Sequence, residues 1–164
     1  MESDPSTPLI SSILIVVGLI VTGGLFVAAE IALISLRESQ VKQLALRGKR
    51  GAIVAKLAAN PNRLLGALQV GVTLTGFLSA ALGAEKLGVY VIPWLEDLGV
   101  PTKSAATTSL IGVTLVIAYF SLVFGELVPK RLALFRTEQI ALASAIFIDS
   151  VSYTHLTLPT SDLV

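Results

Sequence analysis

The stretch SAATTSLIGVTLVIAYFSLVFG, residues 104–125, contains no charged side chain and leads directly into ELVPK, residues 126–130. Residues 9–29 and residues 64–84 are equally free of charge. A helix rises about 1.5 Å per residue, so about 20 residues cross the ~30 Å hydrocarbon core of a bilayer. The sequence therefore predicts an all-α membrane protein with three transmembrane helices, at about residues 9–36, 64–84 and 104–126.

The composition of the 164 residues agrees with this class and excludes several others. Charged residues make up 14% of the chain, against about 25% in an average soluble domain. The net charge of +1 gives no electrostatic argument for nucleic acid as a partner. The absence of cysteine excludes disulfides, zinc–thiolate sites and thiol catalysis. Because no nucleophile–base pair and no glycine-rich phosphate loop is present either, we expect a protein that is not an enzyme.

Basic residues gather between the first two apolar stretches, where seven of the twelve in the chain lie. Short loops rich in lysine and arginine stay on the cytoplasmic side. This predicts an extracellular tail at residues 1–8, with residues 37–63 and residues 127 onward in the cytoplasm. The basic residues either set this topology alone or also contact anionic lipid or a soluble domain. The residues assigned to topology or lipid contact are Arg37, Lys42, Arg47, Lys49 and Arg50 of this loop, with Lys130 and Arg131 after the third stretch.

Residues of about 39–60 place apolar side chains on one helix face and lysine and arginine on the other, which is typical of an amphipathic helical belt on the inner membrane surface. Ser39 is the expected N-cap, and Gly48 and Gly51 are expected to break or bend this segment. The residues around Pro93, Gly99 and Pro101 are interpreted as the outer loop. Residues 141–148 are expected to begin a fourth helix.

The end of the third stretch carries the candidate chemistry. Pro129 has no amide hydrogen, so it cannot bond the carbonyl of Gly125, four residues earlier. That carbonyl beside the carboxylate of Glu126 is a pair of hard oxygen ligands, which Mg²⁺ or Ca²⁺ prefers. Since Glu126 ends the uncharged stretch, the sequence places this pair at a membrane face. Further oxygens on the same helix are those of Thr114, Tyr119 and Ser121.

Glu30 is a second carboxylate, near the inner end of the first stretch. An ionisable residue within or beside a span is by default a candidate for function. The alternative for both Glu30 and Glu126 is a structural ion pair with Lys130 or Arg131.

The motifs FVAAEIAL (residues 26–33), the basic loop, the Asn60–Pro61 turn and GELVPK (residues 125–130) together carry a family resemblance. Over roughly residues 8–150 the chain resembles the transmembrane (DUF21) module of the CNNM/CorC family, in its bacterial branch labelled "hemolysin family". The resemblance implies a multi-pass protein of the cell membrane that exports Mg²⁺ in exchange for Na⁺ and forms a homodimer in the lipid bilayer. It also implies that cytosolic CBS domains, which bind ATP, and a CorC-type domain follow the module.

The sequence departs from the family pattern at four positions. The first span of the family often reads Phe-Ser-x-Ser-Glu, and the serine positions here are Val27 and Ala29. The second span often reads Gly-Asn-Asn, which here is Gly71, Val72 and Thr73. Two functions remain open: a Mg²⁺ efflux module, or a non-transporting membrane anchor or sensor that scaffolds the CBS and CorC-type domains. The candidate metal ligands are Glu126, the Gly125 carbonyl, Glu30, Thr73 and Ser121.

The last residues differ in character from the rest of the chain. The run VSYTHLTLPT, residues 151–160, resembles one translated frame of a sequencing-library adaptor. We therefore expect residues 151–164 to be a non-native tail and the chain to be truncated before its cytosolic domains.

Overall fold

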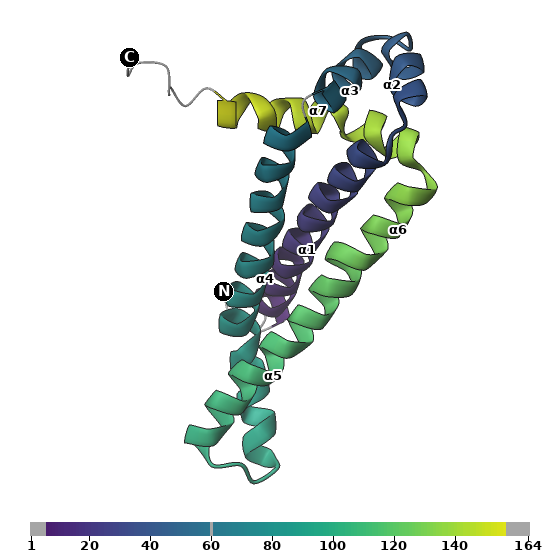
Figure 1. Ribbon diagram of the computed structural model, residues 1–164. Coiled ribbons are helices and arrows are strands. Elements are labelled where there is room, and N and C mark those ends of the chain that lie inside the picture. The colour runs from purple at the N-terminus through teal and green to yellow at the C-terminus, as the bar shows by residue number, and fades with distance from the viewer. Residues whose placement is uncertain (1–5, 60, 157–164) are drawn as a thin grey trace. The chain divides into compact units, whose positions relative to one another are not determined.

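The computed structural model describes the backbone of residues 6–59 and 61–156, and side chains within residues 8–59 and 64–147 (Figure 1). The described residues contain helices and no strand, which confirms the all-α prediction. In chain order the elements are α1 (Ser6–Ser35), α2 (Glu38–Ala45), α3 (Lys49–Ala59), α4 (Pro61–Asp97), α5 (Thr102–Leu122), the π-helical turn η1 (Val123–Leu127), α6 (Val128–Phe135) and α7 (Thr137–Leu156).

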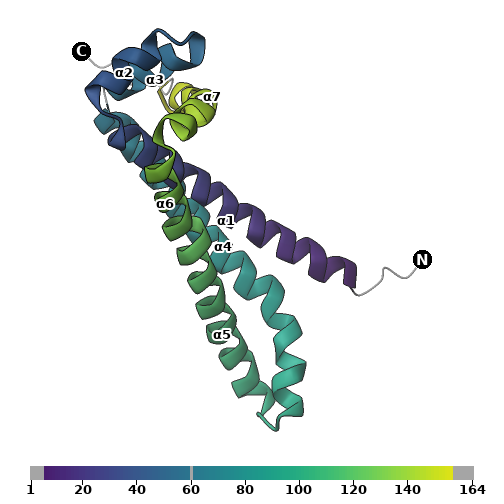
Figure 2. The same cartoon turned by 90° about the vertical axis from the view of Figure 1, so that its right-hand side faces the viewer.

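Three helical segments are long and apolar enough to cross a membrane: Pro8–Ser35, Leu64–Asp97 and Thr102–Phe135. They correspond to α1, α4 and the succession α5–η1–α6, the long helices seen in Figures 1 and 2. Most of their large apolar side chains, such as Leu14, Phe77 and Leu115, are exposed in the isolated chain. In a bilayer such side chains face lipid rather than water, so this exposure is the expected surface of a membrane-embedded protein.

The second and third of these segments are longer than the uncharged stretches. The residues from Glu85 to Asp97, which the sequence interpretation placed in a loop, continue α4 as a helix. The connection to α5 is only a short turn, in which Gly99 has a φ of +87°. Charged residues mark where an apolar stretch ends, but they do not end a helix. Here α4 continues through Pro93 and ends only before the turn at Gly99.

The chain divides into two compact units. Unit one comprises the residues up to Gly24 together with Thr73–Leu127. Its buried apolar cluster joins Val16 and Ile20 of α1 to Ile117 of α5, with Leu87 and Val113 packed against it. The hydroxyl of Ser109 in α5 donates a hydrogen bond of 2.7 Å to the Gly88 carbonyl in α4. Unit one is therefore a three-helix assembly of α1, α4 and α5–η1.

Unit two comprises Leu25–Val72 and the residues from Val128 onward. Its core is built from small and aliphatic side chains of the end of α1, the start of α4 and helices α2, α3, α6 and α7. The buried members are Ala29, Ala32, Leu33, Leu44, Val54, Leu57, Leu64, Leu68, Ala133, Ala141 and Ala145. The amphipathic segment thus buries its apolar positions Leu44, Val54 and Leu57 within this unit.

The local structure of the amphipathic segment differs in two ways from the sequence interpretation. Helix α2 begins at Glu38, so the N-cap position is Arg37 rather than Ser39. The Gln40 side chain accounts for this start, because its Oε1 accepts a 3.0 Å hydrogen bond from the Arg37 amide. Gly48, at a φ of +89°, separates α2 from α3 as expected. Gly51 does not break the chain. It lies inside α3, where a Cβ atom would collide with the Leu44 carbonyl.

The fourth helix begins at Thr137, before the expected residue 141. Glu138, in its first turn, accepts hydrogen bonds from two side chains of unit two: Gln40 Nε2 at 3.0 Å and Arg47 Nη1 at 3.4 Å. A carboxylate in the first turn is also favoured by the helix dipole. Of the predicted non-native tail, residues 151–156 continue the backbone of α7, and residues 157–164 lie outside the described residues.

Candidate functional site

The helix is irregular where the sequence predicts a disturbance. Residues Val123–Leu127 form a π-helical turn, and an α-helix resumes at Val128. In an uninterrupted α-helix the Pro129 ring would collide with the Gly125 carbonyl and leave it without a donor. Widening the turn before the proline relieves this conflict. Such π-turns inside helices occur frequently at functional sites. The helix is thus irregular just before Pro129, with Glu126 inside the π-turn.

Gly125 is buried against α1. A Cβ atom built on it would lie 3.4 Å from the Ile20 carbonyl oxygen and 3.6 Å from Ser121 Oγ. The backbone of the π-turn therefore approaches the backbone of α1, and two oxygen atoms lie beside it: the Ile20 carbonyl and the Ser121 hydroxyl. Both are neutral hard ligands of the kind that complete the shell of a carboxylate-bound cation.

The contact with Ile20 sets the level of this turn along the spans. Ile20 lies eleven residues after Leu9 and nine before Ala29, the two ends of the uncharged stretch of α1. At about 1.5 Å per residue, Gly125 is about 15 Å from either end of that stretch. Glu126 is consequently level with the middle of the apolar part of α1.

The sequence interpretation placed Glu126 at a membrane face, and its level on α1 gives the alternative of a position within the span. That interpretation took the first charge after residue 125 as the end of the span. The third apolar segment in fact continues to Phe135, with Leu127, Leu132 and Leu134 among its exposed apolar side chains. Lys130 and Arg131 follow Glu126 within this helical segment, so charge alone does not fix where the span ends.

The Glu126 side chain is half-buried and has an interaction partner within the described residues, as does Lys130. Within the same residues, no group of three or more His, Cys, Asp or Glu side chains gathers. A cation here would therefore be held by at most two such side chains, together with hydroxyl and carbonyl oxygens. A low ligand charge of this kind suits a cation that must bind and leave again.

Comparison with known proteins supports the resemblance noted in the sequence. The family model for the Cyclin M transmembrane N-terminal domain, CNNM, matches residues 14–159. The chain belongs to the CNNM family.

Among curated relatives, this CNNM chain is 42% identical over 128 residues to a UPF0053 protein of Synechocystis sp., covering 77% of the chain and 29% of that protein. It is 32% identical over 137 residues to the UPF0053 protein YhdT of Bacillus subtilis, covering 83% and 30%. It is 32% identical over 136 residues to a polyamine export protein of Haemophilus influenzae, covering 82% and 31%. The chain thus spans about a third of the length of these relatives.

The positions at which this CNNM chain departs from the family pattern are apolar or exposed. Val27 and Ala29 are buried, 2% and 0% exposed, and Ala29 belongs to the apolar core of unit two. The ring of Phe26 covers Gly71, since a Cβ atom there would lie 3.1 Å from it. Val72 is half-buried, and Thr73 is exposed.

The remaining predicted ligands divide between the two units of the CNNM chain. Ser121 lies beside Gly125, as described above. Glu30 is half-buried and belongs to unit two, with an interaction partner of its own. Thr114 donates its hydroxyl hydrogen to the Leu110 carbonyl at 2.7 Å, and Tyr119 is 63% exposed. The structure therefore brings together Gly125, Ser121 and Glu126 of the predicted set.

Two hydroxyl side chains of α4 that the sequence interpretation did not propose as ligands are buried in unit one. Thr75 is 9% exposed, and its Oγ1 lies 2.9 Å from the position of a Cβ atom on Gly23. Ser79, one helical turn later, is 0% exposed. The spacing of Thr75, Ser79 and Gly83 by four residues was the available signal, because it places all three on one helix face.

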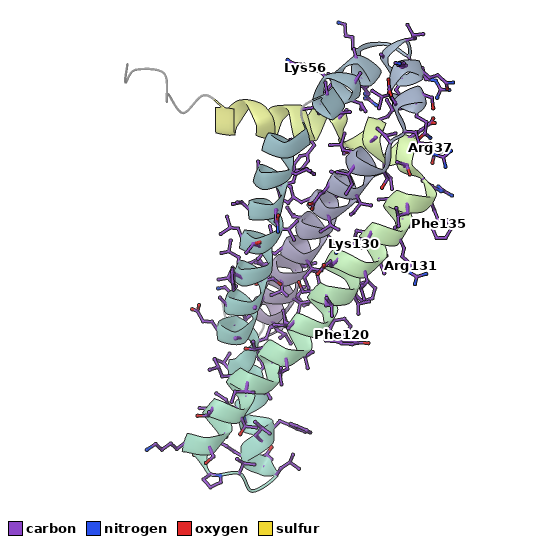
Figure 3. All side chains as sticks on the ribbon, in the orientation of Figure 1. Arg37, Lys56, Phe120, Lys130, Arg131 and Phe135 are labelled. Atoms are coloured by element: carbon purple, nitrogen blue, oxygen red, sulfur yellow. The ribbon has the colours of Figure 1, made fainter. Side chains whose placement is uncertain are left out.

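The predicted topology and lipid-contact residues of the CNNM chain are mostly exposed. Arg37, Lys42, Arg47, Lys49, Arg50 and Arg131 are exposed, and Lys130 is half-buried. Figure 3 shows Lys56 projecting from α3 and Arg131 from α6. Lys42 pairs with Glu38 at 2.7 Å, and Arg47 pairs with Glu138 at 3.4 Å. Exposed pairs of this kind contribute about 1 kcal/mol or less.

Proposed function

We propose that this chain is the membrane module of a cation exporter of the cell membrane, with Mg²⁺ as the exported ion and Na⁺ as the coupling ion. The observation that supports this most strongly is the π-turn at Gly125–Glu126, which packs on Ile20 level with the middle of the apolar stretch of α1.

A carboxylate at that level is costly in a bilayer, and ionisable residues so placed usually mark a substrate or ion pathway. Many secondary transporters bind their ions near the bilayer midplane, at helices whose regular hydrogen bonding is interrupted. The level of Glu126 on α1 supports the first condition, and the π-turn around it supports the second. Its carboxylate, the hydroxyl of Ser121 and nearby backbone carbonyls are all hard oxygens, the ligand type that suits Mg²⁺.

The charge distribution supports an orientation for the module. The exposed basic residues of α2 and α3 belong on the cytoplasmic side, which places the start of α1 outside. The turn between α4 and α5 then lies outside, and α6 and α7 lie toward the cytoplasm. We propose that the module works as a homodimer and is followed by cytosolic CBS domains that bind ATP.

Polyamine export is a second candidate function. One relative, from Haemophilus influenzae, is named a polyamine export protein. The ammonium groups of a polyamine donate hydrogen bonds, which carboxylate, hydroxyl and carbonyl oxygens accept. The oxygen atoms at Glu126 therefore suit either a metal cation or a polyamine.

The third candidate is the non-transporting anchor or sensor. It is favoured by the apolar character of Val27 and Ala29, which are packed inside unit two. It predicts that no cation changes the stability of the membrane module and that no cation crosses the bilayer through it.

The test is ion flux in proteoliposomes that contain the wild-type chain or Glu126→Gln. We expect Mg²⁺ flux in the wild type and a loss of about tenfold or more in the variant, because a ligand charge is removed while the shape is kept. Glu85→Gln is the matched control, since Glu85 is an exposed carboxylate of α4.

The control should transport at the wild-type rate. Equal flux in wild type and Glu126→Gln would remove the role assigned to Glu126. Spermidine flux without Mg²⁺ flux would favour the polyamine function, and no flux of either would favour the anchor.

A further inference from the structure

Ser79 has a buried hydroxyl without a hydrogen-bond partner. Ser79 is 0% exposed. Among the buried side-chain oxygen and nitrogen atoms of the described residues, only Ser79 Oγ has no hydrogen-bond partner. Buried polar groups in proteins are almost always hydrogen-bonded, so each exception requires an explanation.

The usual partner for such a hydroxyl is available in the helix but is not used. Serine and threonine in helices commonly donate to the carbonyl four residues earlier. Thr22 in α1 and Thr114 in α5 do so at 2.7 Å, and so does Ser144 in α7. The other deeply buried serine of unit one, Ser109, donates to the Gly88 carbonyl at 2.7 Å. Ser79 makes neither kind of bond.

The level of Ser79 follows from the residues one turn away on the same face of α4. Thr75 contacts Gly23 of α1, and a Cβ atom on Gly83 would lie 3.4 Å from Val16 Cγ2. Ser79 lies halfway between Thr75 and Gly83, so it is level with a point of α1 halfway between Gly23 and Val16, at about Ile20.

The π-turn approaches α1 at this same level, because Gly125 packs against the Ile20 carbonyl. The same face of α4 also packs on α5, since Gly83 contacts Ile117. By this spacing, the unpartnered hydroxyl of α4 and the Gly125–Glu126 turn lie at about the same level of α1, within unit one.

We propose that the Ser79 hydroxyl is a ligand of the cation that binds at Glu126, an inference that rests on the proposed function. A cation entering between α1, α4 and η1 supplies the partner that the hydroxyl lacks. The hydroxyl adds a neutral oxygen from the second span, in which the two asparagines of the family pattern are replaced by Val72 and Thr73.

The experiment compares Ser79→Ala with Ser109→Ala in the full chain, purified in detergent and reconstituted in proteoliposomes. The midpoint of thermal unfolding is measured during a MgCl₂ titration at constant ionic strength, and Mg²⁺ flux is measured in parallel. Both substitutions remove a buried serine hydroxyl from unit one, but only Ser109 has a hydrogen bond to lose.

For Ser79→Ala we expect an unfolding midpoint without Mg²⁺ equal to or above that of the wild type, because an unpaired polar group is removed. The Mg²⁺ concentration that gives half of the stabilisation should rise about tenfold, with a matching loss of flux. Ser109→Ala should unfold at a lower temperature but keep the Mg²⁺ dependence of the wild type.

An unchanged Mg²⁺ dependence in Ser79→Ala, with a clear response in the wild type, overturns the assignment of Ser79 and leaves the proposed function intact. Loss of stability without Mg²⁺ in Ser79→Ala also contradicts the assignment, because it shows that the hydroxyl has a structural partner. A wild type without any Mg²⁺ response or flux overturns the proposed function and the role of Ser79 together.

Discussion

The space available for a Cβ atom decides whether a position in this chain tolerates a side chain, as two glycines show. Gly125 and Gly51 both lie where a helix passes close to another backbone, but they differ in the space they have. At Gly125 a Cβ atom would make an ordinary contact with the Ile20 carbonyl, whereas at Gly51 it would overlap the Leu44 carbonyl. The second contact tolerates no side chain, because the obstacle is backbone rather than the end of a flexible side chain.

This difference gives a prediction for unit two. We expect Gly51→Ala to destabilise the chain by about 1–3 kcal/mol, since α3 would have to move away from α2. Gly66→Ala is the control, because Gly66 is exposed in α4 and no atom lies within 4 Å of a Cβ placed there. It should stabilise the chain by about 0.5–1 kcal/mol through helix propensity. Thermal unfolding of the two variants measures both effects, and equal midpoints would contradict the packing argument.

At the scale of the helical element, the π-turn and the proline that follows it form one feature. The proline removes a donor and imposes a steric conflict, and the wider turn is the response of the backbone. Hydropathy does not predict this feature, because the segment is apolar throughout the turn. The position of Pro129, four residues after Gly125, does predict it.

Replacing Pro129 by alanine restores the missing amide hydrogen. We expect Pro129→Ala to form a regular α-helix through residues 123–130, with stability equal to that of the wild type or higher. Because the backbone carbonyls would then be satisfied within the helix, the stabilisation by Mg²⁺ should weaken. Amide hydrogen exchange over residues 123–130 and a Mg²⁺ titration of the unfolding midpoint test this.

Pro93→Ala provides the comparison, because Pro93 also lies inside a helix but is exposed near the end of α4. It should leave the Mg²⁺ dependence unchanged. The opposite outcome is a folded Pro129→Ala variant whose amide hydrogen exchange over residues 123–130 and whose Mg²⁺ response both equal those of the wild type. That outcome would show that the proline does not shape the site.

The contact between α2 and α7 is another property of elements rather than of single residues. Glu138 accepts hydrogen bonds from Gln40 at 3.0 Å and Arg47 at 3.4 Å. Arg47 is exposed, so we expect a double-mutant cycle of Arg47→Ala and Glu138→Ala to give a coupling of less than about 1 kcal/mol. The cycle of Gln40→Ala and Glu138→Ala, measured by thermal unfolding, should give the larger coupling. The reverse order would mean that charge rather than hydrogen bonding holds the two helices.

For the whole molecule, the sequence predicts the number of apolar helices, the amphipathic segment and the irregular turn before Pro129. It does not predict the depth of Glu126, because depth depends on which residue of α1 packs against Gly125. It also misses the helical continuation from Glu85 to Asp97, since charged residues end an apolar stretch without ending a helix. Ser79 could be placed on a face by its spacing, but its lack of a partner follows only from the packing of unit one.

Depth and orientation together give a prediction for the molecule in a bilayer. The chain has no cysteine, so single cysteines can be introduced without background labelling. Trp94 is 62% exposed near the turn between α4 and α5, Arg50 is exposed in α3, and Leu127 is 51% exposed beside Glu126. In intact cells we expect a membrane-impermeant maleimide to label Trp94→Cys. Arg50→Cys should react only after permeabilisation.

Leu127→Cys is the decisive position, because the level of Ile20 places it in the apolar part of the bilayer. It should resist the maleimide on both sides despite its exposure in the isolated chain, and react once the protein is unfolded. Rapid labelling of Leu127→Cys after permeabilisation would return Glu126 to the membrane face and remove the argument for a site at mid-depth. Labelling of Arg50→Cys in intact cells would instead reverse the orientation and leave the depth of Glu126 unaffected.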